Sequence, residues 1–147
     1  MRTWSRRAAV ALVASVALGV SGCGLLGSAT VNVVQAEQEL STLMTQTVDL
    51  LGLEVTETQP FSAHRACTRL NGQEGAFTAS AVSGVVTDGS FRADTVAGLL
   101  LDAGFELQRS DRTVEVFGRR DGMWLTATFE PRRGTVVVDV NTGCRAQ

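Results

Sequence analysis

Apolar side chains recur at helical spacing in the segment that follows residue 33. The stripe consists of Leu40, Leu43, Met44, Leu50 and Leu51. Separations of three, four and seven positions are typical of one face of an amphipathic helix. Gly52 follows at once, and glycine is the residue that most often ends a helix in the left-handed conformation. We therefore predict an N-terminal helix over residues 34–51.

The next two stretches predict strands of different clarity. Residues 53–61 read LEVTETQPF and alternate, which permits a strand, but Pro60 interrupts the pattern and the rest of 53–74 has the composition of a loop. Residues 76–86 read AFTASAVSGVV and are small, β-branched and alternating. They predict a strand, with Gly84 as a candidate bulge.

A second amphipathic helix is predicted over residues 91–103. Asp88-Gly89-Ser90 has the composition of a turn, with Ser90 as the candidate N-cap and Asp94 in the first turn. The apolar stripe consists of Val96, Leu99, Leu100 and Ala103. Gly104 then ends the helix.

The C-terminal third predicts a strand meander whose register follows from its turns. A two-residue turn at Asp121-Gly122 and a second turn from 131 to 134 fix the pairing. The first turn sets Arg119 opposite Trp124, and the apolar pairs are Gly118–Leu125, Val116–Ala127, Val114–Phe129, Phe129–Val136, Ala127–Val138 and Leu125–Val140. All the apolar pairs share one face, which Leu107 joins through a turn near Asp111. A slip of one residue would scatter them.

These elements together predict an α+β fold. We expect an antiparallel meander sheet of four or five strands with the 91–103 helix packed on its apolar face. The 34–51 helix is an additional N-terminal element. At 147 residues the chain has room for one such domain, which we assign to residues 34–147.

The first 22 residues have the order of a secretory signal peptide. Three arginines precede an apolar run from Ala8 to Val20, and small residues follow. The run is shorter than the ~20 residues of a membrane-spanning helix. Ser5-Arg6-Arg7 is also similar to a twin-arginine signal, although Ala9 and Val10 favour general secretion.

A lipid anchor is implied by the residues at the end of this signal. Val20-Ser21-Gly22-Cys23 resembles the lipobox of bacterial lipoproteins. The resemblance implies that processing enzymes lipidate Cys23 and remove residues 1–22, so that the lipid tethers the chain to a membrane. Residues 23–33 then form the lipidated cysteine and a short flexible stalk. An ordinary signal peptide with an incidental cysteine is the alternative.

Two cysteines, Cys67 and Cys144, remain after Cys23. In an exported protein they most simply form one disulfide, the alternatives being a metal pair or a catalytic thiol. Cys67 precedes the 76–86 strand and Cys144 follows the last strand, so a bond would make those two strands neighbours. We therefore expect the strand near Leu107 at one edge, then the three meander strands in chain order, then 76–86.

Charge and composition exclude one class of partner. Residues 23–147 carry ten arginines against fifteen acidic residues, a side-chain charge of −5. This acidic balance argues against nucleic acid, whose binding requires a basic surface. The chain has no Lys, Ile or Tyr, which indicates a GC-rich genome and favours an actinobacterial source.

No catalytic, cofactor or metal motif emerges from the sequence. His64 is the only histidine, and a single histidine in a loop is more often a surface residue than a catalyst. No G-x-S-x-G pattern, phosphate-binding glycine loop or calcium loop occurs. We therefore assign no catalytic residue, cofactor or metal ligand.

A possible interaction patch lies on the other face of the meander, at Phe117, Arg119 and Trp124. On the predicted register this face also carries Thr126, Thr128, Val137 and Asp139. Arg119 opposite Trp124 permits a cation–π pair. Exposed aromatic side chains beside arginine suit a protein interface. The alternative, to which we give more weight, is that the 34–51 helix or the 53–62 segment covers Phe117 and Trp124 as a second core layer.

The lipobox, the R-R-D-G-M-W hairpin and the ending VVVDVNTGC together give a family resemblance. The chain resembles small actinobacterial lipoproteins of unassigned function, which implies the fold and one disulfide but no active site. We expect a non-enzymatic binding or assembly module on the extracytoplasmic face of the cell membrane, with an envelope protein as partner. The alternatives are a carrier or sensor of an apolar ligand, for which Ala76, Ala79, Ala81 and Gly84 leave room, and an envelope hydrolase.

Overall fold

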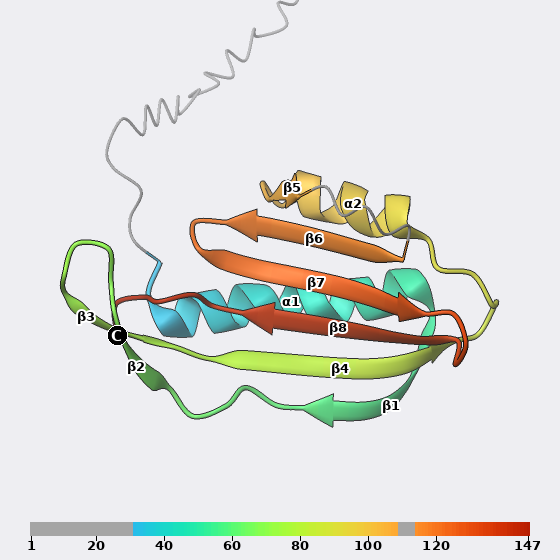
Figure 1. The fold of residues 1–147 in the computed structure, drawn as a ribbon, viewed down its shortest axis with the longest axis horizontal. Helices are drawn as coiled ribbons and strands as arrows, with labels where there is room; N and C mark the ends of the chain where they lie inside the picture. Colours follow the sequence, from blue (N-terminus) through green and yellow to red (C-terminus); the bar gives the residue numbers. More distant parts are fainter. Residues whose placement is uncertain (1–30, 109–113) are drawn as a thin grey trace, which may run out of the picture.

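The computed structural model describes residues 31–108 and 114–147 and contains two helices and eight strands in that part of the chain (Figure 1). In chain order they are α1 (Val33–Leu51), β1 (Leu53–Gln59), β2 (Arg65–Thr68), β3 (Glu74–Phe77), β4 (Ala79–Val86), α2 (Ala93–Asp102), β5 (Glu106–Gln108), β6 (Glu115–Arg120), β7 (Met123–Glu130) and β8 (Thr135–Asn141). The α+β class is confirmed. The predicted signal peptide, Cys23, the stalk up to residue 30 and the turn near Asp111 lie outside the described residues.

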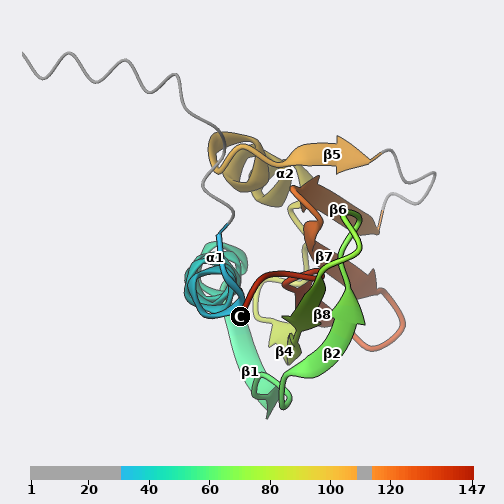
Figure 2. The ribbon, with the colours of Figure 1, turned by 90° about the vertical axis from the view of Figure 1, so that its left-hand side faces the viewer.

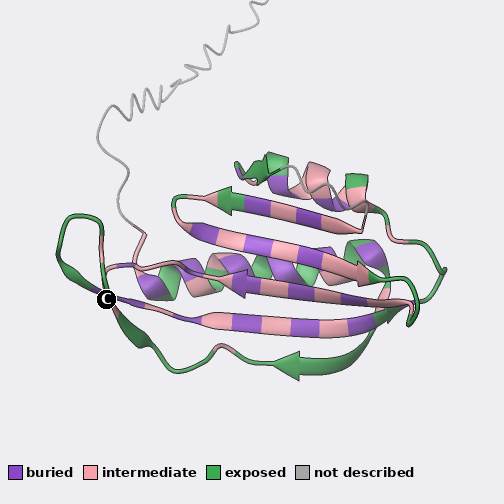
Figure 3. Ribbon diagram, viewed as in Figure 1, coloured by how far each residue is buried: buried purple, intermediate pink, exposed green. Residues whose placement is uncertain are grey.

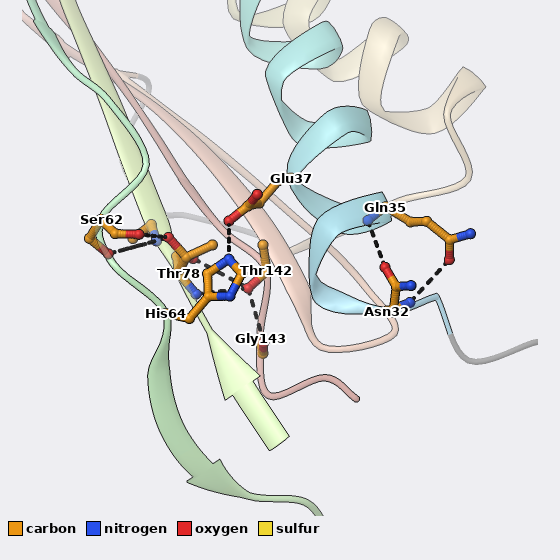
Figure 4. Close-up of polar contacts among 9 residues, drawn as sticks. Asn32, Gln35, Glu37, Ser62, His64, Thr78, Thr142 and Gly143 are labelled. Carbon is orange, nitrogen blue, oxygen red and sulfur yellow. Dashed lines mark hydrogen bonds and ion pairs between the residues drawn. The ribbon is translucent and has the colours of Figure 1, made fainter. Parts of the chain in front are cut away.

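Helix α1 has well-formed ends, one of which the sequence predicted. Gly52 takes the left-handed conformation with φ 59° and caps the C-terminus, as expected. At the other end Asn32 and Gln35 form a capping box, each side chain accepting a backbone N–H of the other residue (Figure 4). The helix buries Leu40, Leu43, Met44 and Leu51, whereas Leu50 is exposed.

The main sheet has six strands in the order β1-β4-β8-β7-β6-β5, every adjacent pair antiparallel. The predicted order of the last five strands is confirmed. The predicted meander register is confirmed as well, from Arg119 opposite Trp124 to Leu125 opposite Val140. Asp121 and Gly122 both have positive φ, as the two-residue turn requires. Leu107 pairs with Gly118, but at the edge strand it remains exposed.

The sheet is larger than predicted because the 53–74 region also forms strands. β1 ends just before Pro60 and pairs with β4 at the edge of the sheet. β2 pairs with β3 in a separate two-stranded sheet. The predicted 76–86 strand is thus two strands that meet at Thr78. The bulge lies in β1 between Val55 and Glu57, facing Gly84 instead of containing it.

Both helices lie on one face of the main sheet (Figure 2). Along β4, β6, β7 and β8 buried residues alternate with less buried ones (Figure 3). The buried set faces the helices, and Leu40, Leu100, Leu125 and Val138 are fully buried between them. The prediction of a helix on the apolar face is confirmed for α2, and α1 packs beside it.

The start of α2 differs from the prediction. Arg92 occupies the N-cap position without a side-chain cap. The Ser90 hydroxyl donates instead to the Asp88 carboxylate at 3.1 Å, so this side chain closes the preceding turn. Asp94 lies in the first turn as expected, and Gly104 follows the helix with φ 78°.

A disulfide joins Cys67 of β2 to Cys144 after β8, as predicted. The two sheets, the core and this disulfide are all formed by residues in the described ranges. Neither helix in the described ranges combines the length and apolar character that crossing a membrane requires.

Candidate interaction surface

The face of the main sheet that points away from α1 and α2 is here called the outer sheet face. Cross-strand partners share a face, so the register defines its rows. One row contains Ala79, Asn141, Trp124 and Arg119, and the next contains Ala81, Asp139, Thr126 and Phe117. Arg119, Trp124, Phe117, Thr126 and Asp139 lie on this face as the sequence predicted, whereas the structure adds Ala79, Ala81 and Asn141.

Phe117 and Trp124 form the aromatic centre of the outer sheet face. They are diagonal neighbours on β6 and β7, with ring centroids 6.2 Å apart and planes inclined by 42°. Both side chains are partly buried, in part against each other. Trp124 therefore packs on Phe117. The cation–π pair that the register permits between Arg119 and Trp124 does not form. Among the described residues a cation–π contact instead joins Arg120 to Phe105, with Arg120 Cζ 4.9 Å from the ring centroid.

The expectation that a second layer covers Phe117 and Trp124 is wrong for both segments considered. Helix α1 packs on the opposite face, against β8 and β4. The 53–62 segment forms β1, which extends the sheet at its edge. The apolar stripe of α1 packs instead over β8, whose Val136, Val138 and Val140 are fully buried.

Asp139 is the carboxylate at the centre of the outer sheet face. It lies between Ala81 of β4 and Thr126 of β7, neither of which is charged. Burial raises the pKa of the Asp139 carboxyl, because the charged form loses hydration. Within the described residues its carboxylate accepts no side-chain hydrogen bond and forms no ion pair. The sequence placed Asp139 on this face but gave it no role, although a carboxylate inside a valine-rich strand was a signal.

The outer sheet face carries excess negative charge. By register its carboxylates are Glu54, Glu57, Glu106, Glu115, Glu130 and Asp139. Arg119 is the arginine that the described strands contribute to this face. Arg133, in the turn after β7, approaches Glu130 at 3.6 Å. A cationic surface would therefore meet opposite charge over most of this face.

His64 does not assemble a catalytic group in the described residues. Its Nε2 lies 2.7 Å from Glu37 Oε1, which ties the segment before β2 to α1 (Figure 4). The nearby Ser62 hydroxyl instead lies 3.3 Å from the hydroxyl of Thr78. Nucleophilic catalysis requires the hydroxyl and the base to share a hydrogen bond, which these two residues do not. Nor does this part of the chain bring three or more His, Cys, Asp or Glu side chains together as a metal site.

The small residues proposed to leave room for a ligand have other surroundings. Ala79 and Ala81 lie on the outer sheet face, away from the helices. At Gly84 a Cβ atom would come within 2.9 Å of the Glu54 carbonyl oxygen, so this glycine permits the close approach of β1. Ala76 lies in β3 of the small sheet, opposite Ala66, so none of the four positions provides space between the helices and the main sheet.

The remaining predicted site residues are distributed as follows. Cys23 lies outside the described residues, and Cys67 and Cys144 form the disulfide at one end of the domain. Phe117, Arg119 and Trp124 lie together on the outer sheet face. No protein-family model, curated protein or solved structure matches this chain.

Proposed function

We propose that this chain is an exported lipoprotein that binds a basic protein of the cell envelope. Lipid on Cys23 anchors the domain at the extracytoplasmic face of the cell membrane, and the outer sheet face is the binding surface. The lipobox at Val20-Ser21-Gly22-Cys23 supports the anchor. The proposal assigns no catalytic step to the domain.

The observation that carries the binding role is the accessible aromatic pair on the outer sheet face. Phe117 and Trp124 contribute nothing to the core between the helices and the sheet. Aromatic side chains are enriched at the centres of protein interfaces, where they account for much of the binding energy. Two small residues, Ala79 and Ala81, lie on the same face on β4, across β8 from Trp124, and permit close approach of a partner there.

The charges on this face favour a partner with arginine or lysine side chains. Asp139 is partly desolvated and lacks a counter-charge in the described residues, so a cationic group that reached it would stabilise its charged form. The surrounding glutamates would accelerate association with such a partner and make it sensitive to salt.

Site-specific photo-crosslinking in cells tests the binding surface. A photoreactive residue at Thr126, on the outer sheet face, should trap a protein whose contact surface is basic. Trp124→Ala should reduce the yield by about tenfold, since a truncated interface aromatic commonly costs more than ~1 kcal/mol. A photoreactive residue at Leu101, exposed on α2, is the matched control. Equal adducts from Thr126 and Leu101, or a yield that Trp124→Ala leaves unchanged, would contradict the proposal.

Intact mass tests the anchor separately. Protein extracted from its native membrane should begin at Cys23 and carry the added mass of acyl chains. A Cys23→Ser variant should lose that mass and leave the membrane fraction. A chain that retains residues 1–22 without added mass would contradict the lipid anchor while leaving the crosslinking result interpretable.

A further inference from the structure

A cavity of about 710 Å³ lies at the end of the domain where the chain enters α1. Its walls come from Val31, the β2–β3 turn, the β6–β7 turn and the segment after β8. Figure 2 views the domain from this end, with the C-terminus and the start of α1 in front. Three arginines line the cavity, Arg69, Arg119 and Arg145, and Asp121 is the acidic residue among them. We call it the arginine pocket.

Arg145 is the buried member of the arginine pocket, at 8% exposure. Its Nε donates to the Thr142 carbonyl at 3.0 Å and its Nη2 donates to the Asp121 carbonyl at 2.5 Å. These acceptors are neutral, and no ion pair in the described residues includes Arg145. Buried guanidinium groups are normally paired with a carboxylate or another anion. The charge of Arg145 is thus held in place without a direct counter-charge.

The other two arginines add positive charge at the rim. Arg69 uses one Nη to donate to the Gln73 side chain at 3.1 Å, which keeps its guanidinium beside the cavity. Arg119 is exposed at the corner shared with the outer sheet face. Burial lowers the pKa of Arg145, and the positive charges of Arg120 and Arg69 lower it further, whereas the carboxylates of Asp121 and Glu39 raise it. A bound anion would relieve this repulsion.

Two features indicate that the arginine pocket faces the membrane. Residues 24–30 separate Cys23 from Val31, and a chain of this length reaches at most roughly 30 Å. Leu70, at the tip of the β2–β3 hairpin, is fully exposed and also lines the cavity. An exposed leucine next to arginines suits the boundary between lipid headgroups and acyl chains.

We propose that the arginine pocket binds the phosphate of an anionic phospholipid headgroup, and that Leu70 inserts beside it. The orientation of the domain, with this pocket toward the membrane, rests on the proposed lipid anchor at Cys23. Arginine pairs with phosphate through parallel N–H···O bonds, and three guanidinium groups around one cavity provide enough donors. The contact fixes the domain upright on the membrane, with the outer sheet face presented sideways to a partner.

Vesicle co-sedimentation tests this site without the anchor. The protein is residues 23–147 with Cys23→Ser, oxidised, and the vesicles are phosphatidylcholine alone or mixed with phosphatidylglycerol. We expect binding only to the mixed vesicles, weakened by about tenfold or more in the Arg69→Gln/Arg119→Gln variant. Arg132→Gln/Arg133→Gln removes the same charge from the β7–β8 turn at the opposite end (Figure 1) and should bind normally. Leu70→Ser should weaken vesicle binding but not phosphate binding.

Comparing vesicle binding with phosphate binding shows whether the bound phosphate belongs to a lipid or to a soluble anion. The same measurements also distinguish failure of the pocket from failure of the lipid anchor. Equal binding to both vesicle types, or equal losses in the two double-arginine variants, would overturn the site. Inorganic phosphate that binds the pocket while mixed vesicles do not would assign a soluble anion and overturn the membrane contact. Because this protein carries no lipid, its result is independent of whether Cys23 is modified, which intact mass decides.

Discussion

At the scale of single residues, Asp139 lies where a carboxylate is least expected. It belongs to β8, an interior strand of the main sheet, and its cross-strand neighbours are uncharged. Burial raises the pKa of its carboxyl above the ordinary value. A carboxyl whose pKa is higher in the folded than in the unfolded state destabilises the fold when it is ionised. Its presence therefore costs stability at neutral pH, which is typical of residues kept for binding.

Asp139→Asn should accordingly stabilise the free domain at neutral pH. The gain is less than about 1 kcal/mol, because water screens a partly exposed carboxylate. It should shrink as the pH falls through the raised pKa and vanish at a pH well below the ordinary Asp pKa of about 3.9, where Asp139 is protonated in both states. Urea unfolding of the wild-type and Asp139→Asn domains across this pH range measures the difference in their free energies of unfolding. Glu54→Gln, at an exposed position, is the control. A gain that grew on acidification would contradict the assigned burial.

At the scale of elements, α2 is held against the sheet by a glycine on the strand beneath it. A Cβ atom at Gly118 would come within 2.9 Å of Leu100 Cδ1 and 3.3 Å of Phe105 Cβ. Both neighbours are buried, so neither has free space to move into. Gly98, within α2 itself, has no atom within 4 Å of the same added position. Gly118 therefore lies within the helix–sheet contact, whereas Gly98 lies on the same helix beside open space.

The same substitution should change stability in opposite directions at these two glycines. Gly118→Ala should lower the free energy of unfolding by about 1–3 kcal/mol, because the helix must shift outward. Gly98→Ala should raise it by roughly 0.5–1 kcal/mol, because alanine is the better helix former. Thermal or urea unfolding of the two variants provides the comparison. A stabilising Gly118→Ala would mean that α2 does not pack closely at this point.

The elements predicted correctly are those in which two local signals agree. The β6–β7–β8 meander combined a two-residue turn at Asp121-Gly122 with an apolar row, and one register satisfied both. β2 and β3 lacked such agreement, since they are four residues long and β2 is nearly all exposed. Ser90 failed as a cap because Asp88, two residues before it, offered a nearer partner.

The candidate sites likewise include one that local signals predicted and one that they did not. Turn geometry alone places Phe117, Arg119 and Trp124 on one face, so the sequence predicted their proximity. It placed the 91–103 helix on the correct face, but it did not decide where the 34–51 helix packs, because both faces of the meander carry large apolar side chains. The arginine pocket was not predicted, since the expected disulfide brings only Arg69 and Arg145 together, whereas Arg119 joins them through the β6–β7 turn, whose Asp121 carbonyl accepts from Arg145.

At the scale of the whole molecule, the two ends of the sheet are built differently. The end near α1's start gathers the C-terminus, the small sheet, the disulfide and the arginine pocket (Figure 1). Buried polar bonds reinforce it, since Thr78 and Thr142 are fully buried and exchange backbone and side-chain hydrogen bonds. The opposite end is held by other contacts, among them the stacked rings of Phe91 and Phe129 and the hydrogen bond from Arg92 to the Leu50 carbonyl. The end on the side of the proposed anchor is therefore the one that the covalent cross-link stabilises.

The disulfide should contribute a large share of the stability of the domain. It links positions 77 residues apart, and chain entropy predicts about 4–5 kcal/mol for a loop of this size. Small domains have only about 5–15 kcal/mol in total. We expect the Cys67→Ser/Cys144→Ser variant to fold, because the hydrogen bonds between Thr78 and Thr142 remain, but with unfolding shifted to much lower urea. Trp124, the one tryptophan after residue 22, reports the transition by fluorescence. A loss below about 1 kcal/mol would mean that the reduced, unfolded chain already holds these two segments together, so that the cross-link removes little entropy.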